Sequence, residues 1–207
     1  MKEPVEYRKE RKEVARFMRR LYRQKLTTTS GGNISLRISK DIVLITPSAT
    51  DKGRMRWKEV GIMSILGVNL TPELRPSSES EMHISIYRRK KDVVAIVHAH
   101  PVIASSFTAM DLALRTDLTA EARAICGTPV VVPYALMGTK DLASVAADSI
   151  GESNILLLEN HGILTTGNTL LEAFDRLEVL ENAAIMTLLV EITGKKKPLG
   201  KMRIREI

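Results

Sequence analysis

This sequence has little of what secreted and membrane proteins depend on. Cys126 is the only cysteine, which excludes an internal disulfide and favours a reducing compartment. No apolar run approaches the roughly 20 residues that cross a bilayer. The first ten residues lack the apolar stretch of a signal peptide. We therefore expect a cytoplasmic protein with no membrane partner.

Aromatic residues are also scarce, at 4% of the chain, which leaves little to stack on exposed bases. The chain is nevertheless basic, with a formal net charge of +7. Its lysines and arginines are spread out, and near the N-terminus they alternate with glutamates. Such charges are typical of solvated helix faces. We expect no nucleic acid partner, although nucleic acid and an anionic small substrate both remain explanations of the charge.

Length and composition indicate one folded domain. The 207 residues, 44% hydrophobic and 27% charged, are enough for a substantial core and too apolar for disorder. No internal repeat or low-complexity linker divides the chain. We expect a single α/β domain over residues 1–207, of which 195–207 form a basic tail.

Hydrophobic spacing predicts alternating helices and strands. Helices are expected over residues 6–25, 79–89, 101–110, 140–150 and 170–192. Strands are expected over 34–38, 42–46, 60–66, 93–97, 130–132, 155–158 and 162–166. The strands at 93–97 and 130–132 are expected to be buried. Ser78 is expected to cap the start of one helix, and Gly194 to end the longest one.

Three of the four histidines follow expected strands. His98 and His100 are two residues apart at a strand end, where such side chains share a face. His161 follows another strand-like run. Each ring taken alone is explained by an ordinary core or loop position. Together, at strand ends where sites gather, they favour one divalent metal, and a zinc site built from cysteines is excluded.

Two segments of small polar residues are candidate anion sites. Ser30-Gly31-Gly32-Asn33 can bring backbone amides close to a phosphate, although a tight turn explains the same pattern. Ser77 and Ser78 precede Glu79 at a helix start, where amide groups favour anions, although helix capping explains this equally well. Glu79 and the fourth histidine, His83, are four residues apart and share a helix face.

Six segments, taken in order, resemble the class II aldolase/adducin family, and most nearly its L-fuculose-phosphate aldolase branch. They are Ser30-Gly31-Gly32-Asn33-Ile34-Ser35, Ile45-Thr46-Pro47-Ser48, Pro76-Ser77-Ser78-Glu79, His98-Ala99-His100, Pro133-Tyr134-Ala135-Leu136-Met137-Gly138-Thr139 and Glu159-Asn160-His161-Gly162. The resemblance extends from about Glu6 to Ile192. It implies a three-layer αβα domain around a mostly antiparallel sheet, assembled as a homotetramer with active sites between subunits.

The resemblance also implies roles for single residues. His98, His100 and His161 would bind Zn²⁺, although another divalent transition metal also suits histidine. Glu79 would touch the metal in the resting enzyme and move away to shuttle protons. The phosphate of a small phosphorylated sugar would bind at Gly32, Asn33, Ser48, Ser77 and Ser78. Ala49 stands where the family has a glycine.

The reaction implied is the reversible cleavage of a 1-phosphoketose, such as L-fuculose 1-phosphate, into dihydroxyacetone phosphate and an aldehyde, such as lactaldehyde. Zinc would polarise the ketone carbonyl, and Glu79 would accept or deliver a proton. Two departures affect the aldehyde half of the substrate. Thr119 stands where the aldolase has a tyrosine proton donor, so Glu121 is the expected acid unless it only opens a helix. The C-terminal tail is also shorter than in the aldolase.

Three alternative functions share this fold. A methylthioribulose-1-phosphate dehydratase keeps three histidines and uses an acidic residue beyond the His-x-His pair, a role that Glu121 fits. A pentulose-phosphate 4-epimerase carries aspartate where Glu79 stands. An adducin-like binding module lacks the metal histidines, so their presence here argues for an enzyme.

Overall fold

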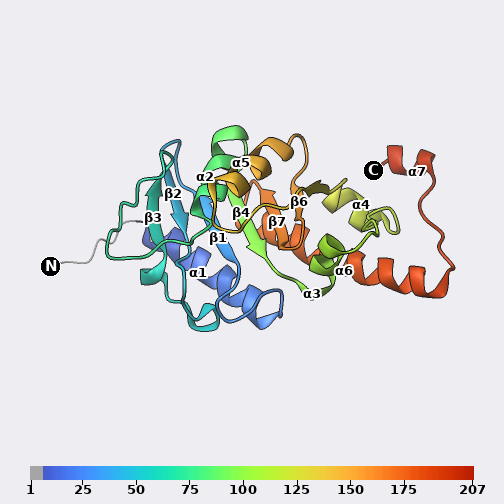
Figure 1. Cartoon of the computed structure of the whole chain (residues 1–207), viewed down its shortest axis with the longest axis horizontal. Helices are drawn as coiled ribbons and strands as arrows, with labels where there is room; N and C mark the ends of the chain where they lie inside the picture. The colour runs from blue at the N-terminus through green and yellow to red at the C-terminus, as the bar shows by residue number, and fades with distance from the viewer. Residues whose placement is uncertain (1–6) are drawn as a thin grey trace.

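A computed structural model describes residues 7–207 as an α/β domain of three layers (Figure 1). A seven-stranded sheet forms the middle layer. Helices α1 and α6 lie on one face of the sheet, and α2 and α5 lie on the other (Figure 1). The expected αβα architecture is confirmed.

The sheet has the strand order β3-β2-β1-β4-β7-β6-β5. The strands are β1 (Asn33–Arg37), β2 (Ile42–Ile45), β3 (Gly61–Ser64), β4 (Ala95–Ala99), β5 (Val130–Val132), β6 (Ile155–Leu158) and β7 (Gly162–Gly167). Every neighbouring pair is antiparallel except β5 and β6, which are parallel. The mostly antiparallel sheet expected from the resemblance is therefore present.

Two buried cores hold the helices on the sheet. The first core involves α1 (Arg8–Arg23), α3 (Val102–Ser106), α4 (Ala120–Cys126) and α6 (Leu170–Thr193). The second involves α2 (Ser80–Arg89) and α5 (Lys140–Ser149). Short 3-10 turns at η1 (Lys52–Arg54), η2 (Trp57–Glu59) and η3 (Phe107–Ala109), and a terminal helix α7 (Lys201–Arg205), complete the described chain.

Helical spacing explains which side of α1 faces the sheet. Val14, Phe17, Met18 and Leu21 recur every three or four residues and are all buried. Phe17 packs against Phe174 of α6, with ring centroids 5.4 Å apart. Arg11 and Ala15 are buried as well, and most of the other residues of α1 are charged and exposed or half-buried. The start of this helix was expected at Glu6, which lies outside the described residues.

The longest helix, α6, ends as expected at Gly194, whose φ of 64° is left-handed. Phe174, Leu177 and Leu180 recur at helical spacing and are buried. The apolar Ile185, further along the helix, is 40% exposed. Ala183, Ala184 and Thr187 are fully buried, so α6 is still packed at this point and Ile185 lies at the edge of its buried face.

Some local expectations were wrong. Val131 in β5 is 63% exposed, not buried, because β5 is a three-residue edge strand. Ser78 does not cap α2. The cap position is Glu79, whose N–H donates to the Ser77 hydroxyl at 3.2 Å. The helix expected over 101–110 is split into α3 and η3. Helix α4 was expected only as the alternative role of Glu121, and α7 was not expected.

None of the helices within residues 7–207 combines the length and apolar character that a membrane crossing requires.

Candidate functional site

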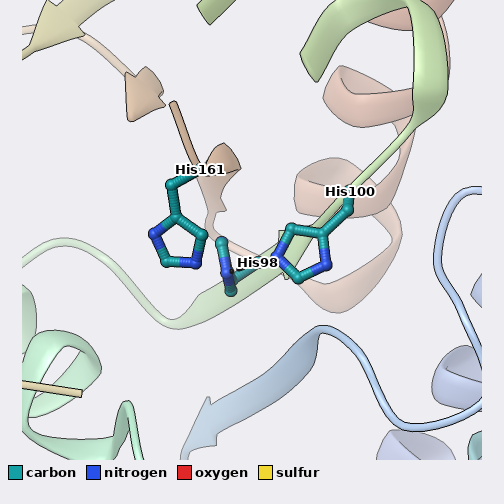
Figure 2. A group of neighbouring side chains, drawn as sticks. All are labelled: His98, His100 and His161. Atoms are coloured by element: carbon teal, nitrogen blue, oxygen red, sulfur yellow. Dashed lines mark hydrogen bonds between the residues drawn. The ribbon is translucent and has the colours of Figure 1, made fainter. Parts of the chain in front are cut away.

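Three imidazole side chains converge at the end of β4 (Figure 2). His98 lies in β4, His100 directly after it, and His161 in the turn between β6 and β7. The Nε2 atoms of His98 and His100 are 3.2 Å apart. One nitrogen from each ring lies within 4.8 Å of the others. The structure therefore brings together the three histidines that the sequence singled out.

Strand pairing sets the relative position of the histidines. β4 runs antiparallel to β7, with His98 opposite Leu164 and Ala99 opposite Ile163. The turn from β6 into β7 passes through Asn160, whose φ of 53° is left-handed. Asparagine tolerates that conformation better than most residues. The tight turn thereby places His161 beside the end of β4.

The first two histidines are in the state that binds metals. His98 Nδ1 lies 2.9 Å from the carbonyl oxygen of Ile163, so we assign the ring proton to Nδ1 and the lone pair to Nε2. Burial lowers the pKa of His98, and it lowers the pKa of His100 to about 3. Both rings are therefore neutral at pH 7, as metal ligands must be.

Gly162 leaves room for the His100 ring. A Cβ at this position would lie 2.4 Å from His100 Cδ2 and 2.8 Å from the carbonyl oxygen of Ala99. Neither distance is compatible with a side chain, so any larger residue would displace the imidazole or the backbone. Gly162 is therefore required because only a residue without a side chain leaves room for the His100 ring.

Glu79 closes the cluster from the start of α2. Its Oε2 lies 3.3 Å from His98 Nε2, and its Oε1 lies 3.1 Å from His161 Nε2. Burial by itself would raise the pKa of Glu79. Attraction to His98, together with contacts to His161 and Asn33, outweighs burial and holds that pKa well below its usual range. Glu79 is therefore a carboxylate aimed at the histidine nitrogens.

The donor set fits a divalent cation. The facing Nε2 atoms of His98 and His100, 3.2 Å apart, repel each other unless a proton or cation lies between them. Two ligands of a tetrahedral zinc ion, each about 2.0–2.1 Å from it, stand about 3.3 Å apart. Glu79 Oε1 is buried and has no aligned hydrogen-bond partner within residues 7–207. Three imidazoles and a carboxylate oxygen thus converge on one point.

Behind Glu79 runs a chain of buried hydrogen bonds. Asn33 Nδ2 donates to Glu79 Oε2 at 2.8 Å, and Asn33 Oδ1 lies 2.5 Å from His83 Nε2. His83 Nδ1 lies 2.6 Å from the Ser35 hydroxyl, which lies 2.9 Å from the Tyr87 hydroxyl. Because Asn33 Oδ1 can only accept, we assign the ring proton of His83 to Nε2. The chain thus connects the sheet interior to Glu79.

A cavity of about 360 Å³ opens beside the histidines. Small and polar residues from several loops line it, namely Ser30, Gly31, Gly32, Asn33, Pro47, Ser48, Lys52, Ser77, Ser78, Glu79, His100, Met137, Asn160 and His161. All five residues expected to bind phosphate are in this lining. Asn33 differs from the other four because both of its amide atoms are turned to Glu79 and His83.

Two left-handed residues shape the loops of this cavity. Gly32 has a φ of 66°, and a Cβ there would lie 2.8 Å from the carbonyl oxygen of His98. Ala49 has a φ of 51°. The glycine that the resemblance places at position 49 therefore has a conformational reason, and alanine adopts the same backbone at some cost in strain.

Lys52 also lines the cavity, although no pattern in the sequence marks it. Its side chain is buried, and its ammonium donates to the carbonyl oxygen of Pro47 at 2.5 Å. Burial lowers the pKa of Lys52 to about 8. A single cation in a loop has no periodicity to reveal it, so only the folded arrangement of the loops shows that it faces the site.

Glu121 lies apart from these residues. It is exposed in the first turn of α4 and does not line the cavity. Thr119 caps that helix, and its hydroxyl accepts the N–H of Ala122 at 3.1 Å. Within one chain, the acid expected from the sequence is therefore not brought to the histidines.

A larger cavity, of about 670 Å³, lies between α1 and residues 54–58. Its lining is basic and apolar, and it contains no carboxylate, imidazole or hydroxyl group. Such a lining offers neither metal ligands nor a general base, so we place the chemistry at the histidine cluster.

Comparison with known proteins gives one family. The model of the class II aldolase and adducin N-terminal domain matches residues 12–188. An L-fuculose phosphate aldolase of Methanococcus vannielii is 34% identical over 86% of this chain and 96% of its own length. A 5-deoxy-D-ribulose 1-phosphate aldolase of Bacillus thuringiensis is 31% identical over 92% of this chain and 90% of its own length. A solved L-fuculose 1-phosphate aldolase superposes with a TM-score of 0.84 at 32% identity, covering 95% of this chain and 92% of that one.

Proposed function

We propose that this chain, a lyase of the class II aldolase and adducin family, cleaves a 1-phosphoketose to dihydroxyacetone phosphate and an aldehyde. L-fuculose 1-phosphate, which would give lactaldehyde, is the first substrate to test. Two relatives named for different sugar phosphates support a phosphorylated ketose more strongly than any one sugar.

The observation that carries this proposal is the convergence of three imidazoles and the Glu79 carboxylate at the edge of a cavity lined by glycines and serines. We propose Zn²⁺ as the metal, with His98, His100, His161 and Glu79 as its ligands. When bound, such a metal supplies Lewis acidity to the ketone carbonyl of the substrate.

Glu79 is the proposed proton carrier. In the cleavage direction, the bond between C3 and C4 of the ketose breaks, and its electron pair stays on C3 beside the carbonyl. The C4 hydroxyl loses its proton as the aldehyde forms, and C3 gains a proton to give dihydroxyacetone phosphate. Glu79 is ionised and held beside the cavity, so it is placed to take up and return a proton there.

The loops around the cavity are the proposed phosphate site. Gly32, Ser48, Ser77 and Ser78 line it and offer hydroxyl or backbone groups to an anion. Asn33 was expected in the same set, but both of its amide atoms are engaged. We assign the Asn33 side chain to the support of Glu79. A phosphate held away from the reacting carbon supplies binding energy that positions the substrate.

A neighbouring subunit would complete the site. Tyr134, Leu136 and Met137 are 60–63% exposed in the loop beside the cavity, which Met137 lines. Clustered exposed apolar side chains are typical of contact surfaces. We therefore propose a homotetramer in which Glu121 acts as an acid in the site of an adjacent subunit.

The single cysteine supports a cytoplasmic location.

The experiment that tests this function is a coupled assay for dihydroxyacetone phosphate. Zinc-loaded protein is given L-fuculose 1-phosphate and related 1-phosphoketoses, with EDTA-treated protein and His100→Ala as controls. The expected result is release that depends on both the metal and His100. If metal binds at one per chain but no 1-phosphoketose releases dihydroxyacetone phosphate, the aldolase proposal is wrong, and loss of water from the substrate becomes the next reaction to assay.

A further inference from the structure

Lys52 is an unusual residue for the interior of a protein. It begins the 3-10 turn η1, and its side chain is 1% exposed. Its backbone N–H donates to the carbonyl oxygen of Thr29 at 2.9 Å, and its ammonium donates to the carbonyl oxygen of Pro47 at 2.5 Å. Lys52 thus connects the two loops that form one side of the cavity beside the histidines.

The ammonium of Lys52 is incompletely satisfied. It has three N–H donors, and within residues 7–207 its one hydrogen-bond acceptor is the Pro47 carbonyl. Glu59 attracts it, but the Glu59 carboxylate also accepts the backbone N–H of Arg56 at 2.6 Å and lies 3.6 Å from the Arg56 guanidinium. A buried cation with so few partners is costly unless an anion joins it.

The cavity provides the place for such an anion. Lys52 shares the lining with Gly32, Ser48, Ser77 and Ser78, which bring hydroxyl and backbone groups but no positive charge. Apart from Lys52, no lysine or arginine in the described chain lines this cavity. The ammonium of Lys52 would therefore supply the positive charge opposite a dianionic group bound among these neutral donors.

We propose that Lys52 is the residue that binds the phosphoryl group of the substrate by charge, and that it makes the site selective for phosphorylated over unphosphorylated ketoses. This inference rests on the proposed function, because it assigns the phosphate end of the substrate to that site. The serines and Gly32 then orient the phosphate, while Lys52 supplies the attraction. The Pro47 contact keeps the ammonium in place before the ligand arrives.

Phosphate binding by the metal-loaded protein tests the inference directly. Inorganic phosphate is titrated calorimetrically into the wild type, Lys52→Met and Lys40→Met. Methionine keeps the length and apolar stem of lysine and removes the charge. Lys40 is the matched control, because it is exposed in the turn after β1, at the opposite end of that strand from Asn33.

Lys52→Met should weaken phosphate binding at least about tenfold, the size of one lost charge-assisted hydrogen bond. Lys40→Met should leave it unchanged, and both variants should keep one metal per chain. If Lys52→Met does not fold, Lys52→Gln replaces it, because the amide can still donate to Pro47. Phosphate affinity equal to that of the wild type in a folded Lys52 variant would overturn the inference.

Kinetics separate this inference from the function on which it rests. If aldol cleavage occurs, Lys52→Met should raise KM for the 1-phosphoketose at least about tenfold. Cleavage with an unchanged KM contradicts the role of Lys52 and leaves the aldolase intact. Absence of cleavage together with Lys52-dependent phosphate binding contradicts the aldolase and supports the phosphate site.

Discussion

His83 donates through Nε2 to Asn33 Oδ1 at 2.5 Å, and this contact decides which atom of Asn33 faces Glu79. Because the asparagine oxygen is held by His83, the amide nitrogen is the atom that reaches the Glu79 carboxylate. A histidine that touches no metal ligand thereby fixes the orientation of a carboxylate that contacts two of the three clustered histidines.

Replacement of His83 should therefore act on turnover more than on substrate binding. In His83→Ala the Asn33 amide is free to rotate, and a charge-assisted hydrogen bond of about 1.5–3 kcal/mol to Glu79 is lost or weakened. We expect kcat to fall about 10- to 100-fold, with metal content and KM for the 1-phosphoketose near wild type. His83→Gln, which retains an N–H donor, should recover part of the loss. A fall in metal content or a large rise in KM would point to general disruption instead.

The same histidine makes a prediction for pH and stability. Burial first, and repulsion from His98 second, lower the pKa of His83 from 6.5 to about 3. Below pH 6.5 the His83 imidazole is therefore protonated in the unfolded chain and stays neutral in the folded chain, so folding stability falls as the pH falls. The loss approaches about 1.4 kcal/mol per pH unit down to about pH 3. Urea unfolding of metal-free protein at several pH values should give a flatter pH dependence for His83→Gln, and equal slopes would contradict this assignment.

Gly162→Ala should weaken metal binding without unfolding the protein. The added Cβ would lie 2.4 Å from His100 Cδ2, so the ring must move from its position beside His98. We expect metal affinity to fall at least about tenfold, as happens when the surroundings of a ligand are disturbed. Competition with a chromogenic chelator measures this. Gly200→Ala is the control, since a Cβ there meets nothing within 4 Å.

Mixing two inactive variants tests whether the site is shared between subunits. Glu121→Gln and His100→Ala should each lack activity, because one lacks the proposed acid and the other a proposed metal ligand. If Glu121 acts in the site of a neighbour, mixed oligomers contain sites with both residues intact. Refolding equal amounts of the two together should then restore about a quarter of wild-type activity, the fraction that random assembly allows. No recovery in verified mixed oligomers would exclude a shared site.

Local sequence patterns predicted most of the elements and the histidine cluster. The spacing of Val14, Phe17 and Leu21 explains the buried face of α1, and the two-residue spacing of His98 and His100 predicted their common direction. Both patterns depend on residues near each other in the chain, whose relative geometry is set by the secondary structure. For the same reason, the left-handed end of α6 at Gly194 was predictable.

The parts that were missed depend on contacts between distant segments. Val131 reads as buried from its apolar neighbours, but it lies in an edge strand, which no local pattern reveals. Lys52 faces the cavity because its turn packs between two other loops. Asn33 was expected to bind phosphate on its small-residue context, whereas its partners Glu79 and His83 come from a helix far along the chain.

Six elements, from α3 to β6, lie between His100 and His161 in the chain, so the three histidines come together only when distant segments have paired. Such long-range pairing is slow to form. A metal held by all three histidines would therefore bind only after β4 and β7 have paired. It would arrive after the sheet is complete and then stabilise the native state by mass action, so metal starvation should leave a folded, inactive protein ready to be loaded.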